Sequence, residues 1–92
     1  SVKISNNVTA IRECTFMNCS SLTNVEIPND VTNIESGAFR SCSSLKSVKI
    51  PDNVESFGYD IFDGCNNLTC TVKSGSIAEY ELGMQKVKLK VK

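Results

Sequence analysis

A spacing of 23 residues recurs through most of the chain. Phenylalanine, cysteine and leucine return at this interval in residues 16–22, 39–45 and 62–68, which read FMNCSSL, FRSCSSL and FDGCNNL. A recurring set of apolar residues indicates structural units that stack on one another, and a period of 23 suits one turn of a solenoid that contains a β-strand. The same interval relates Val2, Val25 and Val48, Ile4, Ile27 and Ile50, Val8, Val31 and Val54, and Ile11, Ile34 and Phe57.

The elements of one unit can be predicted from its local sequence. Residues 22–27 (LTNVEI) place valine and isoleucine two apart, which is the period of a strand with one buried face. Pro28 follows and ends the strand, because proline has no N–H to donate to a sheet. Residues 31–34 predict a second short extended piece, and residues 36–42 predict a tight helical or 3₁₀ return to the next strand.

Stacked units also predict which surface side chains are neighbours. Parallel strands in register place equivalent residues about 4.8 Å apart. We therefore expect Lys3, Glu26 and Lys49 in one outward row with alternating charge, and Arg40 beside Asp63. Because these pairs are exposed, each contributes less than roughly 1 kcal/mol, and we expect them to favour the correct register.

The middle unit, residues 31–51, reads V-x-x-I-x-x-x-A-F-x-x-C-x-x-L-x-x-V-x-I-P. This pattern resembles the BspA-like leucine-rich repeat, also called the Treponema pallidum type, and the resemblance covers residues 1–73. The first unit departs from the pattern at residues 14–15. The third unit departs at residues 60–61 and lacks the terminal Ile-Pro.

The resemblance implies a fold and a broad role. The fold is an α/β repeat, a right-handed leucine-rich-repeat solenoid with short parallel strands, about 23 residues per turn and about three coils over residues 1–73. Proteins with such repeats are secreted or lie on the cell surface of mouth and gut bacteria and of some parasitic protists. They are associated with adhesion to host proteins, other cells or matrix. The family provides no ligand-contact motif that could be assigned to residues of this chain.

The 23-residue rhythm ends after Leu68. The alternation in residues 68–73 (LTCTVK) predicts a last strand. Ser76 and Glu79 have the spacing of a capping box, so we expect a short helix to begin there, and Gly83 to end it or weaken its last turn. The apolar face of this helix is predicted to consist of Ile77, Tyr80 and Met84.

Residues 87–92 (VKLKVK) alternate apolar residues with lysine and predict a final strand. We interpret residues 74–92 as a helix–strand cap that closes the C-terminal end of the solenoid. The lysines have two interpretations. We favour an edge strand that lysine protects from sheet-to-sheet aggregation; a binding site for an anionic partner is the alternative.

The N-terminal end has no equivalent cap. Ile4, Val8, Ile11 and Phe16 belong to the first coil and would face no preceding coil. We expect either that more repeats precede this stretch in the natural protein or that two copies form a homodimer through this uncapped face.

Five cysteines occur, at positions 14, 19, 42, 65 and 70. Three of them keep the 23-residue interval, and a column of free buried thiols is the interpretation we favour. Disulfides favour an even count, zinc sites need closer pairs, and a catalytic thiol needs a basic partner such as histidine, which the chain lacks. Cys14 lies outside the repeated position, and we expect it to be the most reactive thiol.

Composition excludes several classes of function. Ten basic and ten acidic residues balance, so no overall charge favours nucleic acid. No apolar run is long enough to insert into a membrane, and the opening residues SVKI already have a strand pattern, so we expect no signal peptide in this stretch. The absence of histidine removes the usual general base and the commonest metal ligand. We therefore expect no enzyme, no metal and no cofactor.

The most plausible site is the solvent-facing strand surface, where a repeat protein presents a flat polar array. We expect it to bind a protein ligand, such as a host matrix or cell-surface protein, in a secreted or surface adhesion protein. The alternative is a structural spacer in a longer surface protein whose ligand site lies elsewhere. The candidate binding residues are Thr23, Asn24, Glu26, Lys46, Ser47, Lys49 and Thr69.

Overall fold

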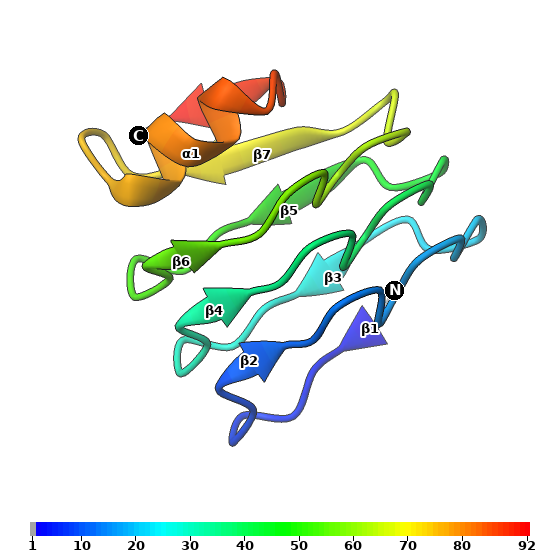
Figure 1. The fold of residues 1–92 in the computed structure, drawn as a ribbon, viewed down its shortest axis with the longest axis horizontal. Helices are drawn as coiled ribbons and strands as arrows, with labels where there is room; N and C mark the ends of the chain where they lie inside the picture. The colour runs from blue at the N-terminus through cyan, green and yellow to red at the C-terminus, as the bar shows by residue number, and fades with distance from the viewer. Residues whose placement is uncertain (1) are drawn as a thin grey trace.

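The computed structural model describes residues 2–92 as a stack of similar coils that ends in a helix and a strand (Figure 1). Each coil contributes two short strands, one to each side of the stack. The elements are β1 (Val2–Lys3), β2 (Ala10–Ile11), β3 (Val25–Glu26), β4 (Asn33–Ile34), β5 (Ser47–Lys49), β6 (Ser56–Phe57), β7 (Thr69–Val72), α1 (Ile77–Met84) and β8 (Leu89–Val91).

The strands form two parallel arrays on opposite sides of the coils. We call the first sheet I: β1 pairs with β3, a single bridge between Asn24 and Ser47 links this pair to β5, and β5 pairs with β7 and then β8. We call the second sheet II, with the order β2-β4-β6. In Figure 1, sheet II lies nearer the viewer, and α1 continues its layer past β6. The chain is therefore a parallel β-solenoid with a C-terminal helix and strand, as expected.

The strand register confirms the 23-residue step. Val2 pairs with Val25 in sheet I, and Asn33 pairs with Ser56 in sheet II. The strands are shorter than predicted, since only two residues of 22–27 belong to β3. The N–H of Leu22 donates to the carbonyl of Cys19 at 3.1 Å, so the start of the predicted strand is part of the preceding turn.

The return segment 36–42 consists of turns and is neither an α-helix nor a 3₁₀-helix. Its N–H groups alternate between two directions. Arg40 donates to Gly37 within the turn at 3.1 Å, whereas Phe39 donates to Ile61 of the next coil at 3.0 Å. A helix cannot form because half of the donors that it requires are bonded to the neighbouring coil.

Two positions in each return turn have the left-handed backbone conformation. This conformation favours glycine, because side chains crowd the backbone there. The two departures of the sequence from the repeat pattern, Cys14 and Asp60, preserve the same backbone. The φ angles are 57°, 66° and 53° at Cys14, Gly37 and Asp60, and 64°, 62° and 81° at Asn18, Ser41 and Gly64.

The core consists of columns in which equivalent side chains of successive coils touch. The rings of Phe16 and Phe39 stack with centroids 5.2 Å apart and planes 5° from parallel, and those of Phe39 and Phe62 are 5.3 Å and 10° apart. Phe39, between the other two rings, is fully buried. Burial of these columns is the main stabilising contribution, at about 25 cal/mol per Å² of apolar surface. Other buried members are Ile11, Val31, Ile34, Leu45, Val48, Ile50, Ile61, Leu68 and Val72.

Helix α1 begins as predicted. The Ser76 hydroxyl accepts a hydrogen bond from the Glu79 N–H at 3.2 Å, and the Glu79 carboxylate accepts one from the Gly75 N–H at 2.8 Å. Of the two alternatives for Gly83, the first is wrong, because the helix runs to Met84; Gly83 lies in its last turn, where its weakening effect stays a prediction. The left-handed residue that turns the chain after the helix is Lys86, with a φ of 62°.

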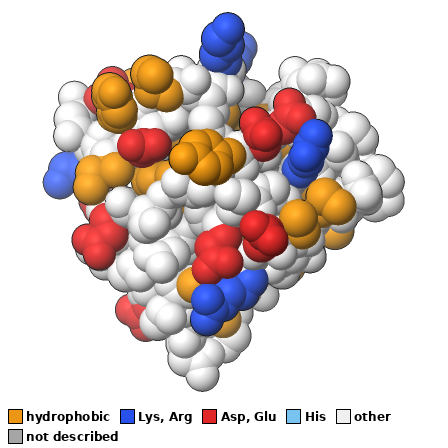
Figure 2. Space-filling view, viewed as in Figure 1, with side chains coloured by type: hydrophobic (Ala, Val, Ile, Leu, Met, Phe, Trp, Pro, Cys, Tyr) orange, Lys and Arg blue, Asp and Glu red, His pale blue; other side chains and the backbone are white. Residues whose placement is uncertain are grey.

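The apolar face predicted for α1 is not the face that the helix buries. Ile77, Tyr80 and Met84 are 49%, 66% and 66% exposed, and the buried residues of the helix are Ala78 and Leu82. Ala78 has a small side chain, which lets the helix backbone approach the last coil, while Leu82 one turn later fills the core. Figure 2 shows apolar side chains gathered with acidic ones between them at the upper left, the region of α1 in Figure 1.

The side chain of Gln85, just after α1, completes the hydrogen bonding of the third coil. In the first two coils the turn closes directly, as when the Ala38 N–H donates to the Glu35 carbonyl at 3.2 Å. In the third coil the Gln85 amide lies between the equivalent groups. Its oxygen accepts from the Ile61 N–H at 3.1 Å, and its nitrogen donates to the Gly58 carbonyl at 2.7 Å. One side-chain amide thereby satisfies two backbone groups at the end of the stack.

Candidate functional site

The structure places the predicted site residues on the outward face of sheet I. Asn24, Ser47 and Thr69 form one row, since Asn24 bridges to Ser47 and Ser47 pairs with Thr69. The Ser47 hydroxyl donates to the Asn24 side-chain oxygen at 2.9 Å, which holds two side chains of this row together. Along each strand these residues alternate with buried ones such as Val48, so the row faces solvent.

The remaining predicted residues lie beside this row. Lys3 pairs with Glu26, so the predicted charged row is confirmed for these two residues. Glu26 and Lys49 each lie two residues beyond Asn24 and Ser47 and share the outward direction, and both are exposed. Thr23 and Lys46 precede the strands, where the Lys46 N–H donates to the Thr23 carbonyl at 2.9 Å. The seven residues therefore belong to neighbouring rows of one face.

The third coil is one residue shorter at this face than the 23-residue step predicts. Ser47 pairs with Thr69, and Lys49 pairs with Thr71. Thr71 pairs in turn with Lys90 of β8, so the outward rows continue onto the last strand. Sequence reasoning missed Thr71 and Lys90 as members of these rows. The sequence does contain a signal for this shortening. The step from the repeated leucine to the next buried strand residue is two residues from Leu68 to Cys70, whereas it is three residues in the earlier units.

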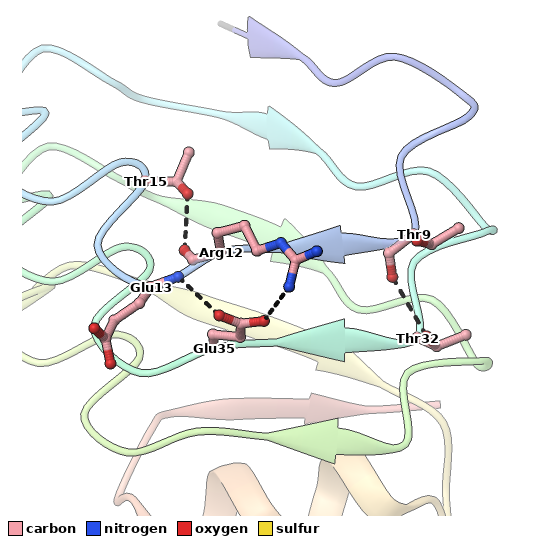
Figure 3. A network of polar contacts seen from close by, with 6 residues as sticks. All are labelled: Thr9, Arg12, Glu13, Thr15, Thr32 and Glu35. Atoms are coloured by element: carbon pink, nitrogen blue, oxygen red, sulfur yellow. Dashed lines mark hydrogen bonds and ion pairs between the residues drawn. The ribbon is translucent and has the colours of Figure 1, made fainter.

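Two ion pairs occur among the described residues 2–92, and both join residues 23 apart. Arg40 and Asp63 are 3.4 Å apart, as predicted, and both are half-exposed. Arg12 and Glu35 on the sheet II side are 3.1 Å apart and were missed, although their spacing is the repeat interval. Figure 3 shows that the Glu35 carboxylate also accepts from the Glu13 N–H, at 3.2 Å.

The polar network in Figure 3 therefore joins the first two coils along sheet II. In it the Thr32 hydroxyl donates to the Thr9 carbonyl at 3.3 Å, and the Thr15 hydroxyl donates to the Arg12 carbonyl at 2.8 Å. Each bond links a side chain to its own turn or to the adjacent coil. The network supports the stacking of coils and offers no group aimed at a ligand.

All five cysteines are free, and the three at the repeated position form a column, as predicted; of these, Cys42 is buried, whereas Cys19 and Cys65 are only partly buried. The Cys42 thiol donates to the Phe16 carbonyl at 3.0 Å, and the Cys65 thiol donates to the Phe39 carbonyl at 3.1 Å. Cys70, the fourth-coil equivalent of Val48, is buried. Cys14 is exposed, and its predicted reactivity stays a prediction.

The thiols of Cys42, Cys65 and Cys70 are held in their protonated form. Burial raises the pKa of Cys70 to about 12 and that of Cys65 to about 11, and it also raises the pKa of Cys42. The charge of a neighbouring thiolate would raise each pKa further, as Cys42 does for Cys65. A protonated thiol is a weak nucleophile and a poor metal ligand, so these cysteines act as small buried donors.

No group of three or more Cys, Asp or Glu side chains suited to a metal lies within residues 2–92. In the same part of the chain, no helix is both long and apolar enough to cross a lipid bilayer. The outward face of sheet I presents hydroxyl, amide, carboxylate and ammonium groups in rows.

The coils, their stacked phenylalanine and leucine columns and their parallel strands define a leucine-rich β-solenoid protein. Within that class the chain belongs to the BspA-type leucine-rich repeat family, because the family model described as "BspA type Leucine rich repeat region (6 copies)" matches residues 1–83. Leucine-rich repeat proteins are typically non-catalytic, and BspA-type proteins are typically surface proteins. No curated protein and no solved structure matches the chain.

The family match extends past residue 73 into α1. The division into repeats at 1–73 and a cap at 74–92 stays a prediction. Helix α1 and strand β8 nevertheless differ from the coils before them, and β8 pairs with β7 at the end of sheet I.

Proposed function

We propose that this chain is a non-enzymatic protein-interaction module of a secreted or cell-surface adhesion protein. It binds a protein ligand, such as a host matrix or cell-surface protein, through the outward face of sheet I. It takes no cofactor, does not bind nucleic acid and does not insert into a membrane. The non-catalytic character of leucine-rich repeat proteins and the usual surface location of the BspA type support this role.

The observation that carries the proposal is the set of outward rows. Polar side chains from successive coils lie at strand spacing on one open face, which is the geometry that solenoids present to extended partners. Asn24 and Ser47 are fixed by their mutual hydrogen bond, so less side-chain freedom is lost when a ligand binds them. Lysine, glutamate and amide groups on the same face give it the varied chemistry that specificity requires.

A binding assay with matched variants tests the proposal. The purified chain is immobilised and exposed to a panel of extracellular-matrix proteins that includes collagen and laminin. Ser47→Arg places a long charged side chain in the centre of the proposed face, and Ser56→Arg makes the same change at an exposed position in β6 of sheet II. We expect at least a tenfold loss of affinity for the first variant and less than a twofold change for the second.

The alternative is a spacer whose longer parent protein binds its ligand elsewhere. One observation favours it: the outward residues of sheet I include no aromatic side chain, and aromatic residues dominate the binding energy of most protein interfaces. Absence of binding to every protein in the panel by the folded chain, or equal losses for the two variants, would support the spacer.

We also propose that two copies meet through the N-terminal face. Within the described residues, β1 pairs only with β3 and β2 only with β4, so each has a free edge. Phe16 stacks on Phe39 with one face of its ring and is only partly buried. Sedimentation equilibrium should show a dimer at high concentration that Phe16→Glu abolishes; a strict monomer at all concentrations would exclude the dimer.

A further inference from the structure

Lysines gather at the C-terminal end of sheet I, on its outward side. We call the set Lys49, Lys73, Lys88, Lys90 and Lys92 the lysine face. Lys49 and Lys90 flank Thr71 in one row across β5, β7 and β8. All five lysines are exposed.

Backbone hydrogen bonds fix the other members of the set. The Cys70 N–H donates to the Lys88 carbonyl at 2.9 Å, which places Lys88 next to Thr69. The Lys92 N–H donates to the Val72 carbonyl at 2.9 Å, and the Ser74 N–H donates to the Lys92 carbonyl at 3.0 Å. The ladder therefore continues one residue beyond β7 and sets Lys73 beside Lys92.

The array has a regular geometry. Lys88, Lys90 and Lys92 alternate along β8 with steps of about 7 Å, since each step covers two residues of an extended strand. Lys49 lies two strands from Lys90, a distance of about 10 Å. Lys49, Lys73 and Lys92 also line a shallow hollow of about 230 Å³ that Thr71 shares. Five positive charges thus lie over one small area.

These charges have little acidic compensation nearby. Both ion pairs of the described residues, Arg12–Glu35 and Arg40–Asp63, involve arginines in other parts of the structure. One carboxylate, that of Asp52, lines the hollow, and the exposed Glu26 lies beside Lys49 in the neighbouring strand. The five positive charges outnumber these two carboxylates and repel each other, and an anionic chain would relieve that repulsion. The face is therefore complementary to a polyanion.

The surrounding residues select the kind of polyanion. No aromatic side chain lies among the outward rows, so bases of a single-stranded nucleic acid would find nothing to stack on. The one exposed apolar side chain in β8, that of Val91, alternates with the lysines and pairs with the buried Val72, so it does not lie among them to enter a lipid surface. Lysine is depleted in protein interfaces, which disfavours an acidic protein. Hydroxyl groups do accompany them, on Ser47, Thr69 and Thr71, and these can exchange hydrogen bonds with sugar hydroxyls.

We propose that the lysine face binds a sulfated polysaccharide chain that lies along β8, with its sulfates against the lysine ammonium groups. The site adjoins the protein-binding face proposed above and shares Ser47, Lys49 and Thr69 with it, whereas Lys73 and the three lysines of residues 88–92 belong to this site alone. Protection of the edge strand against aggregation is compatible with this binding, since both depend on the same exposed charges.

Titration with heparin tests the proposal, with N- and O-desulfated heparin as the matched ligand. Binding to heparin should weaken steeply with salt, with a slope of log K against log salt near −4 for five contacts, as for other linear polyanions. Desulfated heparin should bind at least tenfold more weakly. Equal binding of the two polysaccharides would overturn the proposal.

Matched variants locate the site. Lys88→Gln/Lys90→Gln/Lys92→Gln should weaken heparin binding at least tenfold and reduce the salt slope to about −2. Lys3→Gln/Arg12→Gln/Arg40→Gln removes the same net charge from the first two coils and should change the affinity less than twofold. Equal losses would mean that heparin senses overall charge, which would overturn the proposal.

Two further measurements separate folding effects and other ligands. Lys88→Arg/Lys90→Arg/Lys92→Arg keeps the charges and should bind heparin within threefold of the original chain; its failure to bind while circular dichroism shows it folded would overturn the proposal. Single-stranded DNA and phosphatidylserine vesicles, at the same ionic strength, should bind at least tenfold more weakly than heparin. Tighter binding of either would reassign the face to that ligand.

Discussion

Phe39 is the middle ring of the phenylalanine column, and its removal tests whether stacking between coils stabilises the protein. The ring is fully buried and has a parallel neighbour on each side, with centroids 5.2 and 5.3 Å away. Truncation of such a ring to alanine costs about 3–5 kcal/mol, because it removes buried apolar surface and leaves a cavity. We expect Phe39→Ala at the upper end of that range, about 4–5 kcal/mol, because both contacts are lost.

The cost can be compared with the total stability of the chain. At about 0.05–0.15 kcal/mol per residue, a chain of 92 residues has a free energy of unfolding of about 5–14 kcal/mol. Phe39→Ala therefore removes more than a quarter of the total. Phe16→Ala should cost about 2 kcal/mol, because the Phe16 ring has one stacked neighbour and is only partly buried. Tyr59→Ala removes an aromatic ring that is 81% exposed and should cost less than about 0.5 kcal/mol.

Urea denaturation followed by circular dichroism gives these free energies by linear extrapolation. The double variant Phe16→Ala/Phe39→Ala then tests the contact itself. If the rings stabilise each other, the double variant should be more stable than the sum of the single losses predicts, by about 0.5–1.5 kcal/mol. Strict additivity, or a Phe39→Ala loss no larger than that of Phe16→Ala, would refute the stacked column as the source of stability.

Four other predictions follow from single positions. Gly58→Ala should destabilise the chain by about 1–3 kcal/mol or more in urea denaturation, because the new Cβ would overlap the backbone nitrogen of Ser36 in the preceding coil. Gly83→Ala meets no atom within 4 Å and should stabilise α1 by about 0.5–1 kcal/mol. Gln85→Ala should cost about 2 kcal/mol or more in the same assay, because two backbone groups lose their partner. The melting temperature should fall as the pH rises above 9. Burial raises the pKa of Cys70 to about 12 in the folded chain, so above pH 9 the unfolded chain loses the thiol proton while the folded chain keeps it, and unfolding becomes more favourable. Cys70→Val removes this thiol and should flatten the fall. A thiol reagent such as DTNB, added at one equivalent, should modify Cys14 first, because this cysteine is exposed. Slow modification that is the same in the Cys14→Ser variant would contradict this prediction.

The repeat interval was sufficient to predict most of the fold. A constant step of 23 places Phe39 over Phe16, Val25 beside Val2 and Arg40 near Asp63 without knowledge of any dihedral angle. The outward rows follow from the same step, because residues that alternate with buried ones in a strand must face solvent.

Three features could not be predicted because they depend on close packing. The buried face of α1 is chosen by Ala78, whose small size allows close approach, and the more apolar face with Tyr80 stays in solvent. The return turns do not form helices because half of their backbone N–H groups donate to the next coil. Helix propensity is a local property of the sequence and cannot predict these bonds between coils. The extension of the rows to Lys90 depends on a one-residue shortening of the third coil, so a strict interval misplaces it.

The bond pattern of Gln85 has a consequence for how long such an array can be. The amide imitates a peptide group and bridges two backbone groups of the last full coil, the Ile61 N–H and the Gly58 carbonyl, whose equivalents in the earlier coils bond directly to each other. A duplicated 23-residue coil inserted ahead of the last one would therefore meet a terminator that already fits. Duplication or deletion of whole turns in the gene would leave the closing segment intact. The number of turns can therefore vary without a change at Gln85.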